Sequence, residues 1–217
     1  MMLTLRRTLL TLALLALAAG TAIAATPKGP APVEGQDYVR IDGGAPFAPV
    51  KGTVEVVEAF SYTCNHCAAF EPQLATWAKA LPKTARLVPL PVSFGGPTDT
   101  FARVYFAARA LKAPASAHGA LFKALHEQGT LPLRNATESE IAQFYTRYNL
   151  SPTKFLASMQ SKAIADQARR AQAFVMRAGI EGTPTLIING RYRITAGSRE
   201  DTLRVADHLI ARESRAR

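Results

Sequence analysis

The sequence is poor in cysteine, in acidic residues and in long apolar runs. Only two of its 217 residues are cysteine, and 16 acidic residues stand against 26 lysines and arginines, which gives a formal net charge of +10. The basic residues are scattered, and no stripe of them alternates with aromatic residues, as a nucleic-acid surface would require. We therefore expect solvated helix faces and no nucleic-acid partner. Internal repeats and low-complexity tracts are also absent.

The one long apolar run stands at the N-terminus. Arg6 and Arg7 precede a leucine- and alanine-rich run at 8–19, which is shorter than the ~20 residues that span a bilayer. Ala22-Ile23-Ala24 fits a small-x-small cleavage site. The pattern predicts a cleaved secretory signal peptide at 1–24 rather than a membrane anchor. Its removal takes away two arginines and no acid, so the net charge falls from +10 to +8. We expect a soluble protein outside the cytosol, where disulfides persist.

The next part of the chain has the pattern of an α/β sheet. Residues 25–36 are rich in proline and glycine and indicate a flexible lead-in. Pro72 should bend the predicted helix that contains it, and Pro89 and Pro91 mark their strand as irregular or as a sheet edge. The elements expected here are an edge strand at 37–41, a buried strand at 53–60, a helix from the cysteine pair to about residue 80, and a strand at 85–94.

Helical periodicity alone follows from about 97 to 179, with a capping box at Thr137-x-x-Glu140 and an N-cap before proline at Ser151-Pro152. Strands then return around Asn189-Gly190, a pair that favours a two-residue hairpin turn. A terminal helix begins after Ser198. The fold class is therefore α/β with a helical insertion. We divide the chain into signal peptide 1–24, lead-in 25–36, first sheet part 37–96, helical insertion 97–165 and second sheet part 166–217.

The two cysteines stand three positions apart in "EAFSYTCNHCAAFEP", residues 58–72. A disulfide between Cys64 and Cys67 closes a very short loop and contributes roughly 2 kcal/mol by chain entropy, against nearly 5 kcal/mol for a loop of about a hundred residues. A zinc or copper site would need two further ligands. His66 lies between the cysteines, and the other histidines stand in predicted helices without paired spacing: His118, His126 and His208. Both the structural staple and the metal site are therefore disfavoured.

A redox centre explains more of the sequence. A strand that ends at Phe60 and a helix that begins near Cys64 place the first thiol at a helix N-terminus, where unpaired N–H groups and the helix dipole favour an anion. Asn65 and His66 add a polar side chain and a cation beside it. A favoured thiolate stabilises the reduced form, which makes the disulfide a stronger oxidant. Cys64 is then the exposed nucleophile, and Cys67, one turn inward, is the resolving thiol.

The stretch "VVEAFSYTCNHCAAFEP" resembles the active site of the DsbA-type thiol:disulfide oxidoreductases, whose usual motif is E-x-F-x-x-x-C-x-H-C after an apolar strand. "GIEGTPTLIINGRY" is similar to their second signature, a loop that carries a cis-proline. The two motifs occur in the family's order, about 120 residues apart, and the resemblance covers nearly the whole chain after the signal peptide. It implies a thioredoxin-like mixed sheet with an inserted helical subdomain.

The resemblance also implies a role for each matching residue. Cys64 matches the attacking cysteine, Cys67 the resolving cysteine, and His66 the histidine that stabilises the thiolate. Thr183-Pro184 matches the cis-proline loop, which packs over the cysteines and offers backbone groups to a substrate strand. Glu58 matches a buried glutamate that relays protons from the inner cysteine; its alternative is a strand-end residue that reaches solvent.

The sequence departs from the family pattern at three positions. Asn65 replaces a frequent proline in the dipeptide that tunes the redox potential. Pro89 stands near the place on the third strand where a lysine often accompanies the buried acid. Thr183 replaces the valine of many strong oxidases and also resembles the isomerase branch of the fold. The isomerases carry an N-terminal dimerisation domain, for which the dozen or so lead-in residues are too few, so we expect a monomer.

The function implied is a periplasmic dithiol oxidase without cofactor or metal, which introduces disulfides into secreted proteins through Cys64 and Cys67. Its substrates would be thiols of unfolded secreted proteins, and a membrane quinone reductase of the DsbB type would reoxidise it. Three alternatives stay open. They are a reductase or isomerase of the same fold, a periplasmic metal-binding module that uses Cys64, Cys67 and His66, and a non-catalytic holdase chaperone.

Overall fold

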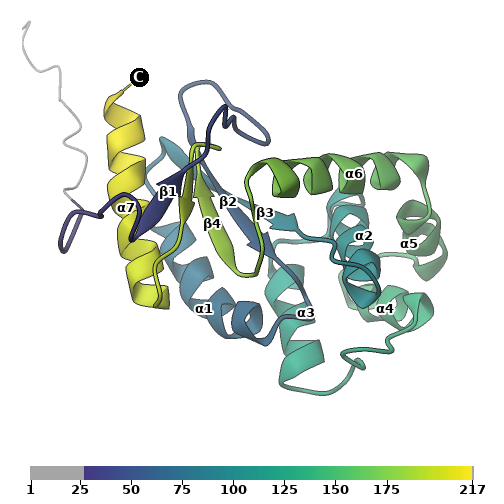
Figure 1. Ribbon diagram of the computed structural model, residues 1–217. Helices are drawn as coiled ribbons and strands as arrows, with labels where there is room; N and C mark the ends of the chain where they lie inside the picture. The colour runs from purple at the N-terminus through teal and green to yellow at the C-terminus, as the bar shows by residue number, and fades with distance from the viewer. Residues whose placement is uncertain (1–26, 217) are drawn as a thin grey trace, which may run out of the picture.

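A computed structural model describes residues 27–216, and the predicted signal peptide lies outside the described residues. Their strands form one sheet in the order β1-β5-β4-β2-β3 (Figure 1). The strands are β1 Tyr38–Arg40, β2 Val54–Phe60, β3 Ala85–Pro91, β4 Thr185–Ile188 and β5 Tyr192–Ile194. The helices are α1 Asn65–Lys79, α2 Pro97–Ala110, α3 Ser116–His126, α4 Glu138–Phe144, α5 Pro152–Met159, α6 Lys162–Arg177 and α7 Arg199–Arg215, with a 3₁₀ turn η1 at Tyr145–Tyr148.

The sheet is mixed, as expected of a thioredoxin-like fold. β2 runs parallel to β3, to which α1 connects it, and antiparallel to β4. β4 and β5 form the predicted hairpin, in which Asn189 and Gly190 have φ of 52° and 67°. β1 lies at one edge and β3, with its prolines, at the other. Both edge predictions are therefore confirmed.

The buried strand β2 separates two apolar layers. Val54 and Val56 pack with residues of α1 and α7 on one face, and Val57 and Ala59 pack with residues of α6 on the other. All seven residues of β2 are buried, which is why the strand reads as a nearly continuous apolar run. The Trp77 Nε1–H donates to Asp207 Oδ1 at 2.8 Å and joins α1 to α7.

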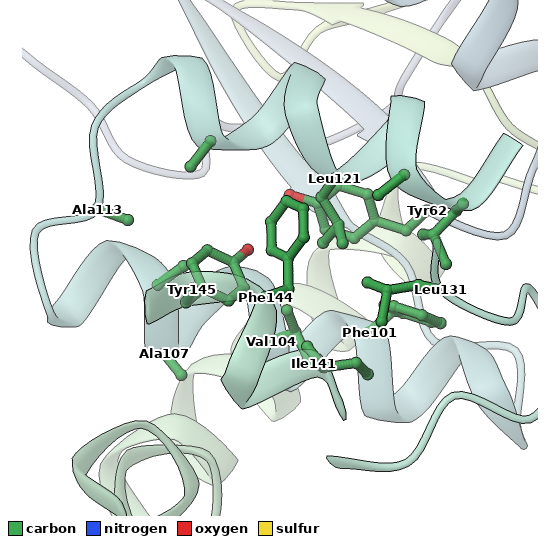
Figure 2. Packing of buried hydrophobic residues seen from close by; sticks show 14 of the residues in the cluster. Tyr62, Phe101, Val104, Ala107, Ala113, Leu121, Leu131, Ile141, Phe144 and Tyr145 are labelled. Atoms are coloured by element: carbon green, nitrogen blue, oxygen red, sulfur yellow. The ribbon is translucent and has the colours of Figure 1, made fainter. Parts of the chain in front are cut away.

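The helices α2 to α6 all lie between β3 and β4 in the chain (Figure 1). Residues of α2 to α5 form a further apolar core beside the sheet, whereas α6 packs on the sheet itself. Figure 2 shows Tyr62, from the loop after β2, among the side chains of this core. The capping box at Thr137 and Glu140 and the Ser151 cap are present as predicted. α6 runs without a break across the predicted boundary between 165 and 166, and we propose to place that boundary before its N-cap, Ser161. No helix among residues 27–216 is long and apolar enough to cross a membrane.

Candidate active site

Cys64 occupies the N-cap of α1, directly after the loop that leaves the buried strand β2. Its backbone is extended, with φ −87° and ψ 117°, and its sulfur accepts a hydrogen bond from the Cys67 N–H at 3.3 Å. This is the position where a serine or aspartate oxygen usually caps a helix, so the free N–H groups of the first turn face a sulfur instead. Both cysteines are thiols in this structure, Cys64 half-buried and Cys67 fully buried.

The loop before β4 approaches Cys64 from the other side. The bond between Thr183 and Pro184 is cis, as the resemblance implied, and the Cys64 thiol donates to the Thr183 carbonyl oxygen at 3.3 Å. β4 pairs with β2 up to the register Ala59 with Thr185, and this pairing fixes the loop beside the end of β2. The sheet therefore brings together the two motifs that are far apart in the sequence.

The two thiols differ strongly in acidity. A hydrogen bond from the Cys67 side chain, then hydrogen bonds from Thr183 and from the backbone N–H groups of Cys67 and His66, lower the pKa of Cys64 to about 5 against the opposing effect of its partial burial. The pKa of Cys67 is raised, because its proton is engaged with Cys64 and its surroundings are apolar. Cys64 is thus the thiolate and Cys67 the protonated thiol at neutral pH.

His66 is exposed, and its backbone N–H donates to Asn65 Oδ1 at 2.9 Å. The residue borders a cavity of about 450 Å³ together with Thr183, Pro184 and the first turn of α7. The contribution of His66 to the low pKa of Cys64 comes through its backbone N–H, a group that any residue except proline supplies. The cavity therefore lies beside the cis-proline and the histidine between the two cysteines.

Glu58 lies in β2 with only 1% of its surface exposed, so the alternative of a strand-end residue in solvent is wrong. Neither of its carboxylate oxygens has a hydrogen-bond partner. Its neighbour in register on β3 is Pro89, which brings no charge. Burial, followed by the nearby Glu71 and Cys64, raises the pKa of Glu58 well above its ordinary value. Burial therefore favours the protonated carboxyl group, which is close enough to Cys64 to feel its charge.

Two further residues near Glu58 were not predicted. Glu71 lies one helical turn after Cys67, and burial raises its pKa to about 7. His118 comes from α3, and burial, together with the charge of Arg109, lowers its pKa to about 4. The spacing of Glu71 from Cys67 was a usable signal, because residues four apart share a helix face. Nothing in the sequence indicated that His118 of α3 would face them.

The potential metal ligands are arranged differently from the sequence-based alternative. Among residues 27–216, the side chains whose ligand atoms lie within 4.8 Å of one another are Glu58, Glu71 and His118. The cysteine pair and His66 form no such group in this part of the chain. The alternative of a metal module at Cys64, Cys67 and His66 therefore gains no geometric support.

A thioredoxin-like sheet with a reactive thiol at a helix N-terminus, a buried partner thiol and a cis-proline loop defines a thiol:disulfide oxidoreductase. A family model described as thioredoxin matches residues 44–207. Thiol:disulfide interchange protein DsbA of Pseudomonas aeruginosa is 35% identical over 84% of this chain and 86% of its own, and that of Pseudomonas syringae pv. tomato is 32% identical over 93% and 94%. The crystal structure of oxidoreductase DsbA from Xylella fastidiosa has a TM-score of 0.82 at 43% identity, over 86% of this chain and 99% of that one. The chain belongs to the DsbA family of thiol:disulfide oxidoreductases.

Proposed function

We propose that the protein is a dithiol oxidase of the periplasm that transfers the Cys64–Cys67 disulfide to thiols of unfolded secreted proteins. A substrate thiolate attacks Cys64 Sγ, which forms a mixed disulfide and releases Cys67. A second substrate thiolate then attacks the substrate sulfur of the mixed disulfide and releases the Cys64 thiolate. Two electrons pass from the substrate thiols to the cysteine pair, and the substrate leaves with a disulfide.

The observation that carries this direction is the set of hydrogen bonds on the Cys64 sulfur. The Cys67 N–H donates to it at 3.3 Å, and Cys67 and Thr183 contribute side-chain hydrogen bonds that lower its pKa to about 5. A thiolate stabilised in this way lowers the free energy of the reduced protein and makes Cys64 a good leaving group. The equilibrium therefore favours reduction of this protein and oxidation of its substrate.

We assign Glu58 the role of proton donor to Cys67 and proton acceptor when the disulfide forms again. Cys67 holds its proton tightly, so its release as a leaving group requires an acid nearby. Glu58 has a raised pKa and sits under the cysteine pair without competing hydrogen-bond partners. Its proton is therefore free for transfer to the inner thiol.

Substrate chains are proposed to lie in the cavity that His66, Thr183 and Pro184 border, with backbone pairing near Thr183. His66 would add to thiolate stabilisation when it is protonated. A membrane quinone reductase of the DsbB type would return the disulfide to the monomeric protein. Periplasmic localisation would follow from cleavage of a signal peptide at 1–24, whose sequence pattern supports export.

The equilibrium redox potential in glutathione buffers tests the proposal. We would measure the reduced fraction of the purified protein by thiol alkylation and gel shift, because the single tryptophan, Trp77, lies ten residues beyond Cys67 on α1 and is bonded to Asp207. A potential well above about −270 mV, the value of a reducing thioredoxin, supports a dithiol oxidase. A potential near that value, with fast insulin reduction, would instead make the protein a reductase of the same fold.

A further inference from the structure

A cavity of about 610 Å³ lies beside α1, on the side of the buried carboxyl group of Glu58 rather than at the substrate-facing cavity. Three potential metal ligands from three separate elements border it, Glu58 of β2, Glu71 of α1 and His118 of α3. Each offers one ligand atom, and these atoms lie within 4.8 Å of one another. Of these three residues, only Glu58 has a role in the proposed thiol–disulfide exchange, and that role does not require the other two.

Glu58 lacks the partners that a buried carboxylate normally has. Both of its oxygens are buried and without a hydrogen bond. Glu55, three residues earlier in the same strand and equally buried, accepts hydrogen bonds from the backbone N–H groups of Phe47 and Ala48 and pairs with Arg86 at 3.1 Å. Glu55 therefore has hydrogen-bond and charge partners among residues 27–216, whereas Glu58 has none there and faces Glu71 and His118.

His118 is oriented for ligation by its second ring nitrogen. Nδ1 lies 2.6 Å from the Tyr62 hydroxyl oxygen, and Nε2 lies 3.6 Å from Glu71 Oε2 without a hydrogen-bond partner. When Nδ1–H donates to Tyr62, the lone pair of Nε2 faces the two carboxyl groups. In histidine metal ligands, a hydrogen bond at the ring nitrogen that does not bind the ion, here Nδ1, fixes the orientation of the ring.

We propose that Glu58, Glu71 and His118 form a binding site for a first-row divalent metal ion, for which Zn²⁺ is the best match. One imidazole nitrogen and two carboxylate oxygens are a ligand set that Zn²⁺ accepts at about 2.0–2.2 Å, so ligand atoms 3.6 Å apart can share one ion. The fourth position would face the cavity and hold water. The ion would balance the negative charges of Glu58 and Glu71.

This site is separate from the cysteine pair and goes beyond the proposed oxidase function. A bound ion would keep Glu58 as a carboxylate and withdraw it from proton transfer, since metal ligands must be deprotonated. Metal binding would then slow turnover without blocking access to Cys64. The proposal concerns binding itself, so it is tested on the oxidised protein, in which the disulfide removes both thiols as ligands.

The experiment is a titration of the oxidised, metal-free protein with Zn²⁺, followed by calorimetry and by the midpoint of thermal unfolding. We expect one Zn²⁺ per chain and a higher midpoint in its presence. Glu71→Gln and His118→Gln should each weaken binding at least about tenfold, and Tyr62→Phe should weaken it through His118. Co²⁺ in the same site should give visible absorption bands without thiolate charge transfer.

His66→Gln is the matched control, because it removes an exposed histidine near the cysteines and should leave Zn²⁺ affinity unchanged. The thermal unfolding midpoint of each variant without metal shows whether the variant is folded. If His118→Gln is not folded, Glu71→Gln alone tests the site. Two results would overturn the site: no Zn²⁺ binding by the oxidised wild-type protein, or stoichiometric binding that Glu71→Gln and His118→Gln both leave unchanged. Neither result bears on the redox potential, so this proposal and the oxidase proposal fail separately.

Discussion

The sulfur of Cys64 lies 3.3 Å from the carbonyl oxygen of Thr183, a residue 119 positions later in the chain. This contact joins the N-terminus of α1 to the loop before β4, and it exists because β4 pairs with β2 beside the same end of the strand. The residue before the cis-proline therefore touches the reactive atom directly. Its side chain also contributes a hydrogen bond that lowers the pKa of Cys64.

Thr183→Val removes that side-chain hydrogen bond and keeps the size and branching of the residue. We expect the pKa of Cys64 to rise from about 5, since the thiolate loses a donor. The pKa of Cys64 is measured in the reduced protein from the ultraviolet absorbance of the thiolate as a function of pH. Thr185→Val is the control, because the Thr185 hydroxyl donates to the Gly182 carbonyl and not to the sulfur. Superimposable titration curves for wild type and Thr183→Val would refute this role.

Cys67→Ala should raise the pKa of Cys64 further than Thr183→Val does. The side chain of Cys67 is the largest single cause of the low pKa, and alanine keeps only the backbone N–H. His66→Ala should raise it by less than Cys67→Ala, since the backbone N–H of residue 66 is retained. The same absorbance titration ranks the variants. A larger effect of His66→Ala would mean that the charge of the imidazole dominates.

The redox potential should depend on pH with two slopes. Above about pH 5 the reduced protein holds one thiol proton, on Cys67, because Cys64 is a thiolate; below that pH it holds two. Reduction therefore takes up one proton above the break and two below it. The potential should fall by about 30 mV per pH unit above pH 5 and by about 60 mV below it. A single steep slope from pH 4 to pH 8 in glutathione buffers would show that Cys64 stays protonated.

Glu58→Gln should stabilise the protein at neutral pH. The pKa of Glu58 is raised in the folded state, so the folded protein keeps a proton that the unfolded chain loses above about pH 4.5. The contribution of this group to stability is complete below that pH and is lost as the pH rises toward the folded pKa. Glutamine does not titrate, so its contribution to stability does not change with pH. We expect a gain of about 1–3 kcal/mol in the free energy of unfolding at pH 7 and little change at pH 4, by urea denaturation.

Glu55→Gln is the matched comparison for that prediction, on the same strand and equally buried. It should lower the free energy of unfolding at pH 7 by about 1–3 kcal/mol, because Glu55 is bonded to two backbone N–H groups and to Arg86. Opposite signs for the two variants are the expected outcome. Equal losses would mean that Glu58 has stabilising partners in solution.

Much of the architecture could be predicted because its signals are local. The apolar run of β2, the Asn189-Gly190 turn and the caps at Ser151 and Ser198 depend on residues close in sequence, and the structure confirms each. The burial of Glu58 followed from its place inside that apolar run. The cysteine pair and the Thr183-Pro184 loop were recognisable as motifs of a family.

The helix packing around Glu58 could not be predicted, because it depends on contacts between distant elements. Pro89 was expected near this acid from the family resemblance alone, and the parallel pairing of β2 and β3 places it in register with Glu58. His118 meets Glu71 only because α3 packs against α1, and a helical histidine without paired spacing gives no hint of this.

The sulfur of Cys64 both caps the N-terminus of α1 and takes part in the redox reaction. While Cys64 is a thiolate, an anion accepts the Cys67 N–H and interacts with the positive end of the helix. In the disulfide the same sulfur is uncharged and accepts more weakly. Each turnover therefore changes the strength of the first turn of α1, and exchange of the Cys67 amide hydrogen with solvent should be slower in the reduced protein. The rate of hydrogen exchange at the N-terminus of α1 therefore distinguishes the reduced protein from the oxidised protein.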